Sequence, residues 1–223
     1  MASCDFSTHV YSYDDSPGDL QLTNFSLAPE DLTGKIPLII KAQSFTANNS
    51  IKLFGSPWSA PGWMKQNGQM QGGGPLQGDV GGSYYQTFAN YFVKFLEAYA
   101  QKGVKLWGLT MLNEPTCGAH ANFWYQSMYM SPENERDFAK NMWGPAIRNS
   151  QYGKDLKLMI LDDNRGNLPD WADTVFADPN ASNYVDGVAV HWYEDQTKPA
   201  TNLMKTHINH PDKFLLYTEV SKS

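Results

Sequence analysis

The sequence predicts an α/β fold in which parallel strands form part of a (β/α)8 barrel. Short apolar runs alternate five times with helical segments, which is the pattern of strand–helix–strand units. The runs lack polar alternation, which is typical of strands buried on both faces of a parallel sheet. Polar side chains follow several of these runs, where barrels place their chemistry, and this favours a barrel over an open doubly wound sheet.

We expect strands at 51–56, 106–112, 156–161, 185–190 and 214–218, with a short strand at 1–6. Helices are expected between them, several beginning with a proline after a capping residue, at 29–45, 84–101, 132–147, 169–176 and 199–207. Five strands and a stub cannot close a cylinder. We therefore expect residues 1–223 to form one domain, an incomplete (β/α)8 barrel.

Composition excludes several classes of function. The chain has 223 residues, 41% hydrophobic content and a net charge of −6, with no block of Lys or Arg, so nucleic acid is not an expected partner. Cys4 and Cys117 are expected to be free thiols. No phosphate loop follows any strand, and no cofactor is expected. Three Asn-x-Ser triplets predict glycosylation at Asn24, Asn48 and Asn180.

Two carboxylates carry the functional prediction. Asn113-Glu114-Pro115 follows one apolar run, and Pro115 disfavours helical conformation at Glu114. Glu219 ends a similar run. A Glu at a strand end is more often a solvated residue, but two of them on one rim are what glycoside hydrolysis needs.

The other strand ends add polar and aromatic groups. Asp5 could accept two sugar hydroxyls, Trp58 offers a flat wall, and Asn113 could bond the 2-hydroxyl of a sugar. These groups suit a pocket for one pyranose. His207 and His210 have helical spacing but no acidic or Cys partner nearby, so no metal site is expected.

Taken in order, the segments that begin at Met1, Ser56, Tyr91, Asn113, Leu161 and Ala189 resemble the glucosylceramidases, lysosomal acid β-glucosidases of glycoside hydrolase family 30. Those segments are Met-Ala-Ser-Cys-Asp-Phe-Ser, Ser-Pro-Trp, Tyr-Phe-Val-Lys-Phe-Leu, Asn-Glu-Pro, Leu-Asp-Asp and Ala-Val-His-Trp-Tyr. The resemblance covers nearly the whole chain. It implies a (β/α)8 catalytic domain in which strands 1 and 8 and an appended β-sandwich lie outside this stretch.

The resemblance also implies residue roles. Glu114 would be the acid/base and Glu219 the nucleophile of a retaining hydrolase, and we expect neighbouring negative charge to raise the pKa of the acid. His191, Arg165 and Asp162 would orient the glutamates. The implied substrate-binding residues are Asp5, Phe6, Trp58, Asn113, Trp192, Tyr193, Phe123 and Tyr125.

The implied substrate is glucosylceramide or another β-glucoside, in a lysosome, and a saposin-like activator and contact with a membrane surface are left open. One departure is that the family commonly has Glu-Ala-Cys where this chain has Glu219-Val220-Ser221. Two alternatives stay open: a related retaining β-glycanase acting on xylan or a β-glucan, and a catalytically inactive fragment of the hydrolase.

Overall fold

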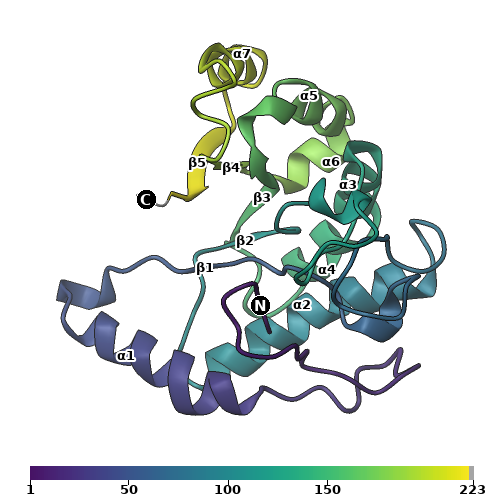
Figure 1. The fold of residues 1–223 in the computed structure, drawn as a ribbon. Helices are drawn as coiled ribbons and strands as arrows, with labels where there is room; N and C mark the ends of the chain where they lie inside the picture. Colours follow the sequence, from purple (N-terminus) through teal and green to yellow (C-terminus); the bar gives the residue numbers. More distant parts are fainter. Residues whose placement is uncertain (221–223) are drawn as a thin grey trace.

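Five parallel strands curl into part of a barrel in this computed structural model, which describes residues 1–220 (Figure 1). Their order in the sheet is the order of the sequence, β1-β2-β3-β4-β5. The bounds are Phe54–Gly55, Gly108–Thr110, Lys157–Asn164, Gly187–His191 and Phe214–Glu219. A doubly wound sheet would reverse its strand order part-way. The sequential order therefore confirms the barrel prediction.

Helices pack on the outside of the strands (Figure 1). The α-helices are α1 (Ile36–Ser44), α2 (Ser83–Gln101), α3 (Pro132–Phe138), α4 (Gly144–Arg148), α5 (Asp170–Phe176), α6 (Pro179–Tyr184) and α7 (Thr201–Asn209). The long helix α2 contributes a buried aromatic face that includes Phe88, Phe92 and Phe95. Phe92 meets Trp143 edge-on, with ring centroids 5.7 Å apart. This packing fixes α2 against the segment that precedes α4.

The hydrophobic core lies along β3 and β4. All five residues of β4 are buried, as are Leu158 to Asp163 of β3. Burial of consecutive residues means that both faces of these strands are covered, as their continuous apolar sequence predicts. The polar groups at the ends of β3 and β4 thus follow strands that are buried on both faces.

The structure differs from the sequence prediction at several elements. Residues 1–6 form no strand, because Ser3 bonds the carbonyl of Tyr11 through its backbone N–H and its hydroxyl instead of joining a ladder. The helix expected at 132–147 is interrupted by a π turn, Ala139–Trp143, before Pro145, which has no N–H to donate. Helix α6 was not predicted; the Asp178 side chain caps it by accepting from the N–H of Asn180 at 2.9 Å.

Irregular backbone collects near the strand ends. The register between β3 and β4 shifts between Leu161 and Asp163, and that between β4 and β5 shifts at His191. Leu161 and Asp162 have φ values of +70° and +55°. Within residues 1–220 no helix is long and apolar enough to cross a membrane.

Ile160 tests the contribution of the strand core to stability. It is fully buried in β3, so we expect Ile160→Ala to lower the free energy of unfolding by about 2–5 kcal/mol, from lost burial and the cavity left behind. Leu38→Ala, at a side chain that is 70% exposed on α1, should change it by less than about 0.5 kcal/mol. Urea unfolding followed by circular dichroism measures both, and equal losses would contradict this placement of the core.

Candidate active site

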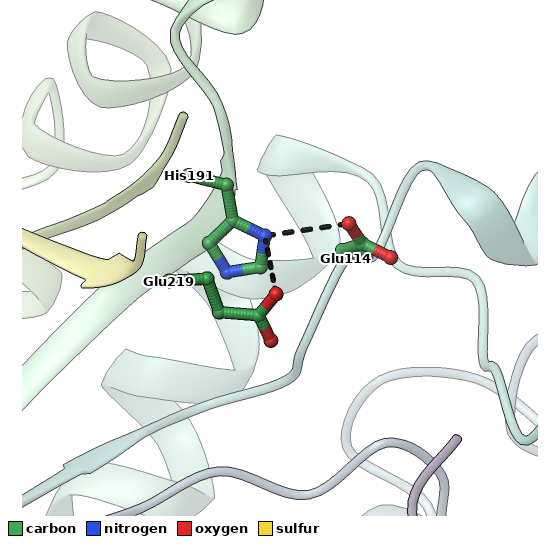
Figure 2. Close-up of side chains that lie close together, drawn as sticks. All are labelled: Glu114, His191 and Glu219. Carbon is green, nitrogen blue, oxygen red and sulfur yellow. Dashed lines mark hydrogen bonds and ion pairs between the residues drawn. The ribbon is translucent and has the colours of Figure 1, made fainter. Parts of the chain in front are cut away.

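Four neighbouring strands deliver their polar residues to one place. Glu114 follows β2, Asp162 lies near the end of β3, and His191 and Glu219 end β4 and β5. Because parallel strands end at the same rim, these side chains converge. Figure 2 shows one ring nitrogen of His191 directed at the carboxylates of both Glu114 and Glu219.

The two glutamates face each other at short range. His191 Nδ1 lies 3.3 Å from Glu114 Oε1 and 3.8 Å from Glu219 Oε2. One oxygen of each carboxylate and a ring nitrogen of His191 all lie within 4.8 Å of one another. No packed hydrocarbon separates the two acids, so one substrate atom can meet both.

Asp162 supports His191 from the other side. Its Oδ1 lies 3.2 Å from His191 Nε2 and accepts the Thr218 hydroxyl at 2.6 Å, while Oδ2 accepts the Thr110 hydroxyl at 2.7 Å. Burial would lower the pKa of His191, but its bonds to Asp162 and Glu114 raise that pKa to about 10. The imidazole is therefore a cation at neutral and acidic pH.

Glu114 is held by three donors. Besides His191, the hydroxyl of Tyr125 donates to Oε2 at 2.7 Å and the thiol of Cys117 lies 3.6 Å from the same oxygen. Burial alone would raise the pKa of Glu114, but these bonds and the charge of His191 outweigh it and lower the pKa. The expectation that negative neighbours raise the pKa of Glu114 is thus wrong, because the donors around it lower that pKa.

The pKa of Glu219 shifts in the opposite direction to that of Glu114. Burial raises the pKa of Glu219, and the negative charge of Glu114 raises it further. The charge of His191 and the 2.8 Å hydrogen bond from the Tyr193 hydroxyl oppose this rise. The pKa of Glu219 ends above its usual value. With its amide oriented to satisfy both neighbours, Asn113 donates to Glu219 Oε1 at 3.1 Å and accepts from Trp58 Nε1 at 3.2 Å.

The backbone at Glu114 is unusual. Its φ is +44°, a left-handed conformation that non-glycine residues rarely adopt. Hydrogen bonds on both sides hold it there: Asn113 N–H donates to Pro57 O at 2.8 Å and Glu114 N–H donates to Asp162 O at 2.9 Å. Strained residues of this kind gather at functional sites because surrounding structure must enforce them.

A cavity of about 300 Å³ opens above the glutamates. Its lining combines the two acids with polar and aromatic groups: Asp5, Trp58, Asn113, Cys117, Tyr125, Asn164 and Tyr193. The Oδ1 atom of Asp5 is buried without a hydrogen-bond partner in the described chain, and burial raises the pKa of this carboxyl group. An unpaired acceptor in this position suits a ligand hydroxyl.

Other residues singled out in the sequence lie outside the cavity lining. Phe6 is 90% exposed, and Phe123 packs edge-on against Tyr125 with ring centroids 4.5 Å apart. The indole N–H of Trp192 is buried without a partner among the described residues. Arg165, expected to orient the glutamates, instead donates to Lys198 O at 3.0 Å and pairs with Asp195 at 2.9 Å, so it anchors the loop after Tyr193.

Sequence reasoning missed several supporting residues. Thr110 and Thr218 reach inward from β2 and β5, but a strand threonine has no sequence mark that distinguishes it. Lys65 is fully buried, and its ammonium donates to the carbonyls of Met70, Gly72 and Ser127 at 3.1, 3.1 and 2.6 Å. Since lysines are almost always exposed, nothing in the sequence indicated that Lys65 fastens the loop that carries Tyr125.

The remaining predicted sites can be placed briefly. Asn24, Asn48 and Asn180 are exposed. His210 pairs with Asp173 at 2.7 Å. Glu114, His191 and Glu219 are spaced as metal ligands could be, but a protonated imidazole between the two acids opposes a cation there.

Comparisons with known proteins agree with the family resemblance found in the sequence. The model of the glycosyl hydrolase family 30 TIM-barrel domain matches residues 1–223. "Putative glucosylceramidase 4" of Caenorhabditis elegans is 52% identical over 219 residues, which cover 98% of this chain and 42% of that protein. The mouse protein "Lysosomal acid glucosylceramidase" is 49% identical over 220 residues, with 98% and 42% covered.

Among solved structures, "The endo-beta1,6-glucanase BT3312" superposes with a TM-score of 0.84 and 29% identity, covering 99% of this chain and 47% of that one. The chain spans about two fifths of the length of the curated relatives it matches.

The charge state of His191 can be measured. We expect nitrogen NMR to show its imidazole protonated up to about pH 10, and Asp162→Asn to lower that pKa by roughly one to three units. The folded pKa lies above the unfolded value of 6.5, so the stability it contributes is complete below about pH 6.5 and is lost as pH rises through about 10. Asp212→Asn, at an exposed loop residue, is the control, and a His191 pKa near 6.5 in the unaltered protein would refute this.

Proposed function

Because this chain belongs to glycosyl hydrolase family 30, we propose that the protein hydrolyses β-glucosides, with glucosylceramide as substrate, and retains the anomeric configuration. The proposal that the anomeric configuration is retained rests on one observation, the distance between the two carboxyl groups. Retaining glycosidases hold their carboxyl groups about 5–5.5 Å apart, and inverting enzymes need roughly 6.5–9.5 Å to admit a water molecule. Oxygens of Glu114 and Glu219 lie within 4.8 Å of each other, which supports direct nucleophilic attack.

In the proposed first step, the carboxylate of Glu219 attacks the anomeric carbon and forms a glycosyl ester. The bond to the aglycone oxygen breaks, and Glu114 gives that oxygen its proton. In the second step Glu114 removes a proton from water, whose oxygen displaces Glu219. The product sugar leaves with the configuration it had, and both glutamates return to their starting states.

The proton must be on Glu114 when the first step begins. The lowered pKa of Glu114 and the raised pKa of Glu219 favour the opposite arrangement. His191 Nδ1 lies 3.3 Å from Glu114 Oε1 and 3.8 Å from Glu219 Oε2, so the imidazolium couples the protonation of one acid to that of the other. The pair then titrates as a unit, and acidic surroundings favour its singly protonated form.

The cavity supplies the groups that would bind glucose. Asp5 would accept sugar hydroxyls, Trp58 would stack on an apolar sugar face, and Asn113 would donate to the 2-hydroxyl beside the nucleophile. Tyr125 and Tyr193 already orient the two glutamates by hydrogen bonds. Phe6, Phe123 and Trp192, which do not line the cavity, would act at its entrance.

The cellular part of the proposal rests on similarity. The mouse relative is named a lysosomal acid glucosylceramidase, which supports a lysosomal location here. A saposin-like activator and contact with a membrane surface belong to the same proposal, because the lipid part of glucosylceramide lies in a membrane. Glycosylation of Asn24, Asn48 and Asn180, all exposed, is consistent with a secretory route.

A second candidate is a β-glucanase. The solved structure with a TM-score of 0.84 is named an endo-β1,6-glucanase, and a Neurospora crassa protein with that name is 37% identical over 196 residues. Glucosylceramide and a β-1,6-glucan oligosaccharide, offered in parallel, distinguish the two substrates. No turnover of either would favour the third alternative, a catalytically inactive fragment of the hydrolase.

Glutamine substitutions test the two roles. We expect Glu219→Gln to lower kcat on the order of 10⁴-fold for every substrate, because no nucleophile remains. Glu114→Gln should slow hydrolysis of poor leaving groups much more than that of activated aryl glucosides, which need no proton. Steady-state assays on the purified protein measure both effects.

The control is Glu133→Gln, at an exposed position of α3. Equal losses of Glu114→Gln on both substrate classes would argue against the acid/base role. Proton NMR of the first product formed should show the β anomer, and an initial α anomer would overturn the retaining mechanism.

A further inference from the structure

A second buried glutamate lies outside the cavity. Glu135 of α3 is only 1% exposed, although no cation pairs with it in the described part of the chain. Its Oε1 accepts the backbone N–H of Leu161 at 3.1 Å, and its Oε2 accepts the indole N–H of Trp171 on α5. Buried carboxyl groups are rare and normally have a reason, and the contacts of this one lead directly to β3.

Leu161 and Asp162 form a left-handed bulge in β3. Their φ values are +70° and +55°, which cost on the order of 1–3 kcal/mol each for residues other than glycine. The pairing between β3 and β4 loses its register at this point, so the N–H of Leu161 turns away from the ladder. Glu135 provides the acceptor that this N–H would otherwise lack.

The bulge changes which way the next side chains point. Successive residues of a regular strand face opposite sides of the sheet. Here Asp162 reaches His191, Thr110 and Thr218, while Asp163 accepts the hydroxyl of Thr116 at 2.6 Å, and both acids are buried. The carbonyl of Asp162 also receives the N–H of Glu114 at 2.9 Å. The bulge therefore contacts His191 through the side chain of Asp162 and Glu114 through the carbonyl of Asp162.

We propose that Glu135 is a positioning residue for the catalytic pair: by holding the Leu161 N–H, it keeps Asp162 against His191, which in turn lies between Glu114 and Glu219. This role rests on the proposed hydrolase function. Glu135 does not line the cavity, so it would act only through other residues. Its effect passes through two hydrogen bonds: the Leu161 N–H donates to Glu135, and the His191 imidazole donates to Asp162.

The raised pKa of Glu135 makes its contribution to the stability of the fold largest in acid. Burial raises the pKa of Glu135 to about 7; Trp171 and the Leu161 N–H oppose this, and the charges of Asp162 and Asp163 on β3 add to it. The folded pKa exceeds the unfolded value of 4.5, so the stability it contributes is complete below about pH 4.5 and is lost as pH rises through about 7.

The test compares two substitutions. Glu135→Gln keeps one carbonyl oxygen that can accept the Leu161 N–H, whereas Glu135→Leu removes both oxygens of the carboxyl group. The first readout needs no activity: the pKa of His191 by nitrogen NMR. We expect it to stay near 10 in Glu135→Gln and to fall by at least one unit in Glu135→Leu, because Asp162 withdraws. The control Glu133→Gln, exposed on the same helix, should leave it unchanged.

The second readout is kinetic, at acidic pH. Glu135→Leu should lower kcat on the order of 10²-fold, the effect of misplacing a catalytic group by about 1 Å, with KM nearly unchanged. Glu135→Gln should keep kcat within about threefold. A folded Glu135→Leu protein whose His191 still titrates near 10 would overturn the proposal, even if its melting temperature falls.

If Glu135→Leu does not fold, the unaltered protein supplies the test. The proposal then requires the Leu161 amide signal and the His191 imidazole signal to shift together as Glu135 titrates near pH 7, and a His191 signal that does not respond refutes it. Absence of glucosidase activity in the unaltered protein would count against the proposed function alone, because the NMR result is independent of turnover.

Discussion

One imidazolium holds the site together. His191 lies within 3.8 Å of Glu114 and Glu219 and 3.2 Å from Asp162, and it is fully buried. Three carboxylates at this range would repel one another, and burying them without a cation would be costly. The positive charge of His191 makes the cluster tolerable, and its two ring nitrogens tie β2 and β3 to β4.

The barrel geometry makes this contact possible, and local irregularity completes it. Parallel strands in sequential order bring their C-terminal ends to one rim, so residues far apart in the chain meet. Regular strands would direct only alternate side chains inward. The left-handed residues Glu114, Leu161 and Asp162 break that alternation where the functional groups are needed. The hydroxyls of Thr110 and Thr218, which donate to Asp162, and the carboxyl group of Glu135, which accepts the Leu161 N–H, offset the strain of the β3 residues.

Much of this was predictable from the sequence. The five strands lie where apolar runs predicted them, although β1 and β2 are shorter than expected. Glu114 and Glu219 face each other, with Asp5, Trp58 and Asn113 beside them, as the strand-end pattern indicated. The misplaced expectations concern side chains whose partners come from other elements. Arg165 is an example, since its guanidinium meets a loop carbonyl at Lys198 rather than a glutamate.

The sequence by itself determined the alternation of strands and helices, the positions of the two acids at strand ends and the family to which the chain belongs. Only the tertiary structure decided the direction of their pKa shifts, lowering the pKa of Glu114 and raising that of Glu219, and the use of Glu135 and Lys65 as buried supports. The physical reason is the distance over which each effect acts. Periodicity acts between neighbours in the chain, whereas a pKa depends on every donor, charge and solvent gap within a few ångströms in space.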